Sequence, residues 1–234
     1  SGLNALKTIE GDLFINLNFS LISLSGIDSL TSIGGGIHLE NNIALQSVQA
    51  LSGITGTLEF LYLDANTPLT SIDAFSGVTS ISGELFIFGQ NNLTNLTGLH
   101  TLHSVGGRLL LSANNSLTNV SALSGVTNVG GGLNISGNTS LTSLTGLHAI
   151  DTVGGFVVIA NNPSLTSLTG LNGLTSVGGH LDITNNPLLI NLNGLQALAS
   201  IGGYININAN ASLTSLTGIE NINPSTITNL TIKN

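Results

Sequence analysis

The octapeptide SLTSLTGL occupies residues 140–147, returns at 164–171, and recurs with one change, as SLTSLTGI, at 212–219. Its first Leu belongs to a series spaced by 24 residues: Leu21, Leu45, Leu69, Leu93, Leu117, Leu141, Leu165, Leu189 and Leu213. A fixed period of this length is typical of repeat proteins, in which each unit stacks on the next to bury its apolar face.

Two apolar columns of the repeat never admit a polar residue. The first is Leu24, Val48, Ile72, Leu96, Val120, Leu144, Leu168, Leu192 and Leu216; the second is Ile15, Leu39, Leu63, Ile87, Leu111, Ile135, Ile159, Ile183 and Ile207. The second column alternates with outward positions, which predicts a strand with one buried face. Frequent Thr and the recurring Gly pairs argue against a helix. We therefore expect an all-β, right-handed solenoid of about nine 24-residue coils with parallel sheets, with like positions roughly 4.8 Å apart.

The repeat also predicts the domain organisation. We expect residues 1–234 to form one solenoid domain, with a partial first coil (1–20), regular coils (21–212) and an irregular last coil (213–234). Open solenoid ends expose strand edges and apolar core. The sequence therefore suggests a segment of a longer protein or end-to-end self-association.

A third column is polar and nearly invariant: Asn18, Asn42, Asn66, Gln90, Asn114, Asn138, Asn162, Asn186 and Asn210. A buried amide at a bend can bond to the backbone of its own coil and of its neighbours, whereas an unpaired one costs about 1–3 kcal/mol. We interpret the asparagines of this column as a buried structural ladder and not as ligand-binding residues.

Composition excludes several classes of function. Only 6% of residues are charged and the net charge is −8, with no run of Lys or Arg, so neither nucleic-acid binding nor a polybasic membrane patch is expected. No apolar stretch reaches the ~18 residues of a membrane-spanning helix, so membrane insertion is not expected. Cysteine is absent, so disulfides contribute nothing to stability.

Segment 181–189, LDITNNPLL, resembles the leucine-rich-repeat core LxxLxLxxN. The longer stretch 168–189, LTGLNGLTSVGGHLDITNNPLL, resembles the coils of receptor L domains, and is similar to Asn- and Thr-rich leucine repeats of secreted bacterial surface proteins. The resemblance implies an extracellular or cell-surface module for adhesion or recognition. The absence of Cys-rich flanks favours a bacterial source over a hormone receptor.

Sequence variation is concentrated on the outward face of the predicted strands, whereas the frame of the repeat is constant. Most of the aromatic residues lie in or beside this face, together with acids and Asn. Such a mixture suits a glycan or protein partner. The predicted binding residues are Phe14, His38, Glu40, Tyr62, Asp64, Phe86 and Phe88.

Two other functions remain open. Regular hydroxyl and methyl arrays on a nearly uncharged solenoid are typical of ice-binding proteins, although Thr is also simply a good β residue. The candidate ice-binding residues are Thr70, Thr94, Thr118, Thr142, Thr166 and Thr214 in one column, and Thr97, Thr145, Thr169 and Thr217 in another. The third possibility is a structural spacer or filament subunit that stacks end to end.

Neither catalysis nor a cofactor is predicted. No unit departs from the repeat to bring a Ser, a His and an Asp together. Glu40 and Asp64 are stacked neighbours, but on an open face with little desolvation. No metal site is expected either, because His100 and His148 share a column two coils apart, at about 10 Å, too far for one zinc ion.

Overall fold

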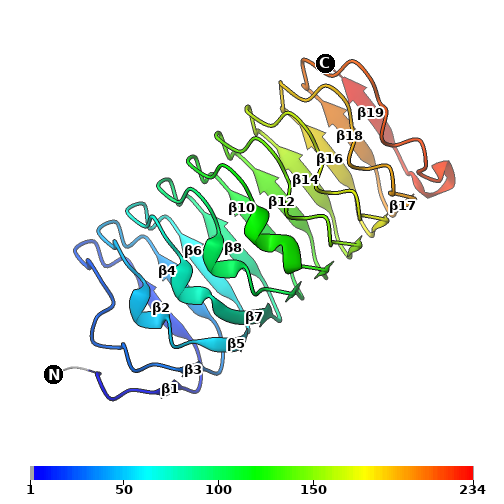
Figure 1. Cartoon of the computed structure of the whole chain (residues 1–234). Coiled ribbons are helices and arrows are strands. Elements are labelled where there is room, and N and C mark those ends of the chain that lie inside the picture. The colour runs from blue at the N-terminus through cyan, green and yellow to red at the C-terminus, as the bar shows by residue number, and fades with distance from the viewer. Residues whose placement is uncertain (1–2, 234) are drawn as a thin grey trace.

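The computed structural model describes residues 3–233 as a single stack of parallel β coils (Figure 1). One ten-stranded sheet, the long-strand sheet, runs the length of the stack, and all its neighbouring strands are parallel. Its strands are β2 (Leu13–Asn16), β4 (Ile37–Glu40), β6 (Leu61–Asp64), β8 (Leu85–Phe88), β10 (Leu109–Ser112), β12 (Leu133–Ser136), β14 (Val157–Ala160), β16 (Leu181–Thr184), β18 (Ile205–Asn208) and β19 (Leu230–Lys233). The prediction of an all-β parallel solenoid is confirmed.

Shorter parallel strands form a second sheet on another side of each coil. They are β5 (Thr55–Leu58), β7 (Gly77–Ile81), β9 (Ser104–Val105), β11 (Asn128–Val129), β13 (Thr152–Val153), β15 (Ser176–Val177) and β17 (Ser200–Ile201), while β1 (Thr8–Ile9) pairs separately with β3 (Ser32–Ile33). Pairing on the long-strand sheet keeps a 24-residue offset from β2 to β18, as in Leu109 opposite Leu133. The last pair is offset by one residue more, with Ile205 opposite Leu230.

Short 3₁₀ helices, which the sequence analysis did not expect, occupy part of some coils. They are η1 (Gln49–Leu51), η2 (Asp73–Phe75), η3 (Thr97–Leu99), η4 (Ser121–Gly125) and, near the C-terminus, η5 (Pro224–Thr226). Most coils with a glycine at this place, such as Gly146, use a turn with φ near +119° instead, whereas Gly98 lies within η3. Ala50, Ala74 and Ala122 replace that glycine and disfavour positive φ, so the chain forms a tight helical turn.

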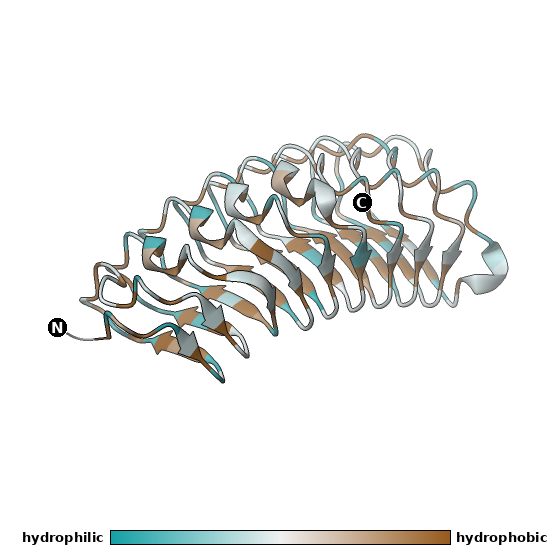
Figure 2. Cartoon of the chain, turned by 60° about the horizontal axis from the view of Figure 1, so that its bottom comes forward, coloured by the Kyte–Doolittle hydropathy of each residue, from teal (hydrophilic) through white to brown (hydrophobic). Residues whose placement is uncertain are grey.

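Leucine, isoleucine and valine side chains fill the interior of the stack. Figure 2 shows hydrophobic and hydrophilic residues alternating along the long strands, and the inward positions of the middle coils, such as Leu144 and Ile135, are fully buried. The end coils differ from the predicted columns because a second coil covers them on one side only. Ile15 is half-buried and Leu216 is 39% exposed. Within residues 3–233, no helix has the length and apolar character needed to cross a membrane.

The asparagine column forms a ladder of hydrogen bonds between coils. The Asn114 Nδ2 donates to Ile87 O of the preceding coil (2.9 Å), and the Asn138 Oδ1 accepts from the Asn114 backbone N (3.1 Å) and Nδ2 (3.3 Å). The same pattern recurs at Asn42, Asn162 and Asn186. Its buried members are Asn42, Asn66, Gln90, Asn114, Asn138, Asn162, Asn186 and Asn210.

Two positions of the ladder depart from expectation. Asn18 donates to the Asn42 Oδ1 as predicted, but it is exposed, because it lies in the partial first coil and has little chain packed on its outer side. At Gln90 the longer side chain turns back to Phe88 O, and its Oε1 is buried without a partner. No hydrogen bond joins the side chains of Asn66 and Gln90, so the ladder is interrupted there.

Replacing Gln90 by Asn should repair this interruption. The shorter amide places its Oδ1 where the other members of the ladder accept from the preceding coil, here from Asn66. We expect Gln90→Asn to raise the free energy of unfolding by about 1 kcal/mol, the net value of one hydrogen bond. In thermal unfolding this is a shift of about 2–4 °C for a chain of this size.

The reciprocal change is the matched control. Asn138→Gln should interrupt an intact part of the ladder and lower the midpoint by a similar or larger amount. A Gln90→Asn protein that melts below the parent chain would contradict this account of the ladder.

Candidate functional site

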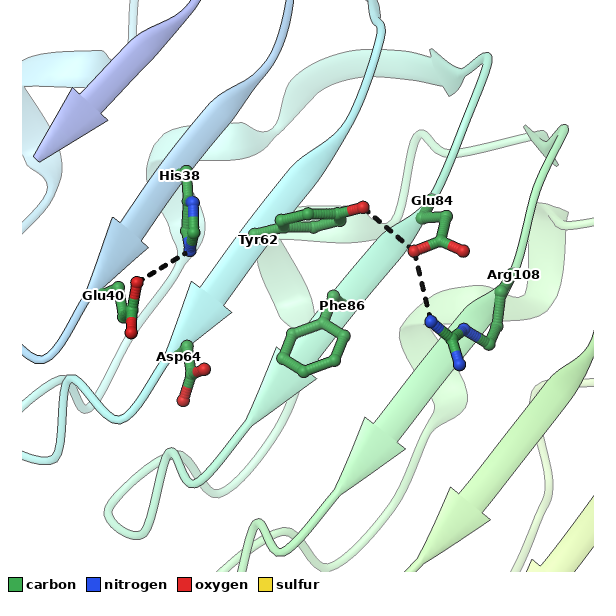
Figure 3. A pocket seen from close by; sticks show the side chains of 7 residues that line it. All are labelled: His38, Glu40, Tyr62, Asp64, Glu84, Phe86 and Arg108. Atoms are coloured by element: carbon green, nitrogen blue, oxygen red, sulfur yellow. Dashed lines mark hydrogen bonds and ion pairs between the residues drawn. The ribbon is translucent and has the colours of Figure 1, made fainter. Parts of the chain in front are cut away.

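The outward positions of strands β4 to β10 surround an open depression of about 270 Å³. Seven side chains line it: His38, Glu40, Tyr62, Asp64, Glu84, Phe86 and Arg108 (Figure 3). Parallel pairing at a fixed offset brings them together, since it sets His38 beside Tyr62 and Glu40 beside Asp64 on neighbouring strands. Residues at equivalent positions of successive coils thus become one continuous surface.

Five of the seven predicted binding residues line the depression. Phe14 and Phe88 lie outside it, but both contact its rings. Phe14 meets His38 edge-on at a centroid distance of 5.8 Å, and Phe88 lies 6.0 Å from Phe86. Phe14 is 57% exposed, because it projects from β2 at the end of the long-strand sheet. The predicted set therefore forms one contiguous patch.

Glu84 and Arg108, which are not among the predicted binding residues, complete the depression. The Tyr62 hydroxyl donates to the Glu84 Oε2 (2.9 Å), and the Arg108 Nη2 lies 3.4 Å from the same oxygen. Both residues stand at the position before a long strand, where other coils carry Asp, Gly, Phe, His or Tyr. Arg108 is one of only three basic residues in the chain, and this rarity was the signal available in the sequence.

Burial and neighbouring charges shift the pKa values of two groups in the depression, Asp64 and Tyr62. Burial raises the pKa of the Asp64 carboxyl, the Glu40 charge raises it further, and His38 partly offsets both. The pKa of Tyr62 is also raised, first by burial, then by the hydrogen bond to Glu84 and by the charge of that carboxylate, with Arg108 opposing. The phenol therefore stays protonated and remains a donor to Glu84.

The coils that carry the depression also depart from the regular repeat. The offset of the short-strand sheet shifts between Gly56 and Thr57, where Gly56 has φ +84°. The same coil lacks the Gly pair, and its Phe60 ring packs over Gly36, where a Cβ would collide with it. The interrupted ladder position, Gln90, follows in the next coil. Local rules are most often broken at functional sites.

A second group of rings lies further along the same sheet face. Phe156, His180 and Tyr204 stand in successive coils, with centroids 5.3 and 4.5 Å apart and ring planes within 12° and 8° of parallel. Gly132 makes room for this group, since a Cβ there would lie 2.6 Å from the Phe156 ring. Nearby, the Asn206 Nδ2 donates to the Asp182 Oδ1 (2.7 Å). The rings contact one another face to face, and none of them lines the depression between His38 and Arg108.

The predicted ice-binding threonines are all exposed. They are Thr70, Thr94, Thr118, Thr142, Thr166, Thr214, Thr97, Thr145, Thr169 and Thr217. Some of their hydroxyls bond within the protein: the Thr118 Oγ1 donates to Thr94 O (3.1 Å), and the hydroxyls of Ser143 and Thr145 pair at 2.8 Å. These bonds hold parts of the array in a regular geometry.

The arrangement in the depression suits binding through aromatic surface and charge. Within the part of the chain described, no group of three or more His, Asp or Glu side chains is placed to hold a metal ion. A scan against protein-family models gives no match, and a search of the curated proteins gives no significant match. Fold and site define the class as a parallel β-solenoid repeat protein, and its function has to be argued from these residues.

Replacing Asp64 by Asn should stabilise the protein in a pH-dependent way. The raised pKa means that the ionised carboxylate is less favourable in the folded chain than in the unfolded one. We expect Asp64→Asn to increase stability at pH 7 by less than about 1 kcal/mol, because water still screens this carboxylate. The gain should vanish in acid, once Asp64 is protonated in both states.

Thermal unfolding of both proteins between pH 3 and pH 8 measures this effect. Glu59→Gln, which removes one charge from an exposed position outside the depression, controls for the change in net charge. A constant difference between Asp64→Asn and the parent chain at every pH would refute the assigned cause.

Proposed function

We propose that this protein is a non-catalytic recognition or adhesion module, displayed outside the cell or at its surface. The partner, a glycan or a protein, binds the long-strand sheet at the depression between His38 and Arg108. The scaffold is a leucine-rich repeat of the receptor L-domain kind, as LDITNNPLL at 181–189 suggests. Its rigidity holds the contact residues in place before the partner arrives, which lowers the entropic cost of binding.

One observation carries this proposal. Aromatic and charged side chains gather around a depression in the sheet face, and the repeat is irregular in the same coils. Half-exposed rings such as Tyr62 and Phe86 are the kind of residue that dominates binding energy at interfaces. The fixed columns elsewhere are explained by packing alone.

Loss of the two central rings should abolish binding. On arrays of glycans and of extracellular proteins, the parent chain should bind particular members, and the double variant Tyr62→Ala/Phe86→Ala should bind them at least about ten-fold more weakly, as expected when ring hot spots are truncated. Phe156→Ala removes a ring from the same sheet outside the depression and is the matched control. Equal binding by the double variant and the parent would refute the assignment of the site.

Ice binding is the second candidate, favoured by the ten exposed threonines in register along the stack. The column from Thr70 to Thr166 is unbroken over five coils, whereas Asp73, Ser121 and Asn193 interrupt the other column. The bonded hydroxyls would present a regular lattice to ice. The third candidate, an end-to-end stacked spacer, has exposed apolar side chains such as Phe19 and Ile232 in its favour.

An ice-binding function predicts faceted ice crystals and thermal hysteresis with micromolar protein. Thr118→Lys, in the middle of the continuous column, should then abolish both effects without lowering the melting temperature appreciably, because the side chain is exposed. Round ice crystals with the parent chain would exclude this candidate.

A further inference from the structure

The ring geometry of the depression restricts what it can bind. His38 and Tyr62 meet at 85°, with centroids 5.4 Å apart, and Tyr62 and Phe86 are tilted by 58° at 5.5 Å. Rings inclined in this way give no common plane on which a sugar ring could lie flat. They instead contact one another and present an uneven apolar surface, along which a narrow aliphatic chain can lie. At about 270 Å³, the depression is below the usual range for small-molecule pockets and suits a single side chain.

The charges of the depression are arranged unevenly. Figure 3 shows Glu84 and Arg108 together at one side and Glu40 and Asp64 at the other, with Tyr62 between them. At the first side, Glu84 already has the Tyr62 hydroxyl and the Arg108 guanidinium as partners. This side is therefore close to neutral, and Arg108 would repel a second cation.

The other side carries unbalanced negative charge. The Glu40 Oε2 lies 3.5 Å from the His38 Nε2, and its Oε1 accepts from the Asn41 Nδ2 (3.1 Å). Asp64 lies next to Glu40 across the parallel pair, and no group of residues 3–233 donates a hydrogen bond to its carboxylate. Like charges on adjacent strands are destabilising. A cation between the two carboxylates would remove this cost and supply the missing donors.

We propose that the depression receives a lysine side chain of a partner protein, with its methylenes along the Tyr62 and Phe86 rings and its ammonium between the Glu40 and Asp64 carboxylates. An ammonium is a compact charge with three donors that can serve two separate carboxylates, whereas a guanidinium favours bidentate contact with one. Aromatic rings beside the carboxylates add cation–π attraction. The inference rests on the proposed recognition function and names the group that is recognised.

The fluorescence of Tyr62 provides a direct test of the inference. The chain contains two tyrosines and no tryptophan, so Tyr204→Phe leaves Tyr62 as the only strong fluorophore, inside the depression. The probe is the peptide Gly-Gly-Lys-Gly-Gly with acetylated and amidated ends, so that the lysine carries its only charge. Matched peptides carry Nε-acetyl-lysine or arginine, and a glucosamine oligomer tests an amine on a sugar. Titration at low salt follows Tyr62 emission.

We expect saturable binding of the lysine peptide, at least about ten-fold weaker binding when acetylation removes the charge, and weaker binding of the arginine peptide. Asp64→Asn should weaken lysine binding about five-fold, as for a partly exposed charge pair, whereas Glu59→Gln should leave it unchanged. Increasing salt should weaken binding further. The Asp64→Asn variant is expected to fold at least as well as the parent chain, so its loss of binding cannot be attributed to unfolding.

Several results would overturn the inference. They are equal binding of the lysine and acetyl-lysine peptides, tighter binding of the glucosamine oligomer, or equal losses in Asp64→Asn and Glu59→Gln, which would indicate nonspecific attraction to an acidic chain. If the array partner requires Tyr62 and Phe86 but no lysine peptide binds, the lysine inference fails and the recognition function stands. If the array partner does not require those rings, the proposed site fails as well.

Discussion

Hydrogen bonding between like positions of successive coils is the constraint on which the rest of the structure depends. Each residue must pack and hydrogen-bond beside the residue that occupies the same position in the neighbouring coil, 24 residues away. This explains the scarcity of charge, because a charged column would stack like charges on neighbouring strands. It explains the glycine columns too, since a Cβ at Gly130 would collide with the carbonyl oxygen of Gly106. Asparagine is suited to its column because it can donate and accept along the same axis.

The fold could be predicted because its determinants repeat. Nine leucines at one spacing and a constant polar column leave few architectures open, and the buried positions of the middle coils follow from them. The 3₁₀ turns were missed because the residue at one position does not decide them: η1, η2 and η4 carry Ala there, but η3 carries Gly98. The exposure of Asn18 and Leu216 was missed because the aligned repeat sequences do not show which coils lie at the ends of the stack.

The candidate site was predictable only in part, for a related reason. His38, Glu40, Tyr62, Asp64 and Phe86 could be found because the outward face of the strands varies from coil to coil while the frame of the repeat is constant. Glu84 and Arg108 stand in a neighbouring column, and only coordinates show that their side chains pair and close one side of the depression. The site thus lies where the repeat is least regular. The shifted pairing at Gly56, the interrupted ladder at Gln90 and the adjacent carboxylates each oppose stability there, and a long stack tolerates such local losses because every coil contacts only its neighbours.

The constant 24-residue offset has an evolutionary consequence. Duplication or deletion of a segment of that length, beginning at any point in the regular coils, leaves every other residue with an equivalent neighbour and changes only the length of the stack. Each added unit would shift a recognition surface along the axis by about 4.8 Å without altering its shape. Such a chain can therefore vary its reach by simple gene rearrangement, and point substitution of outward residues can independently change what is recognised.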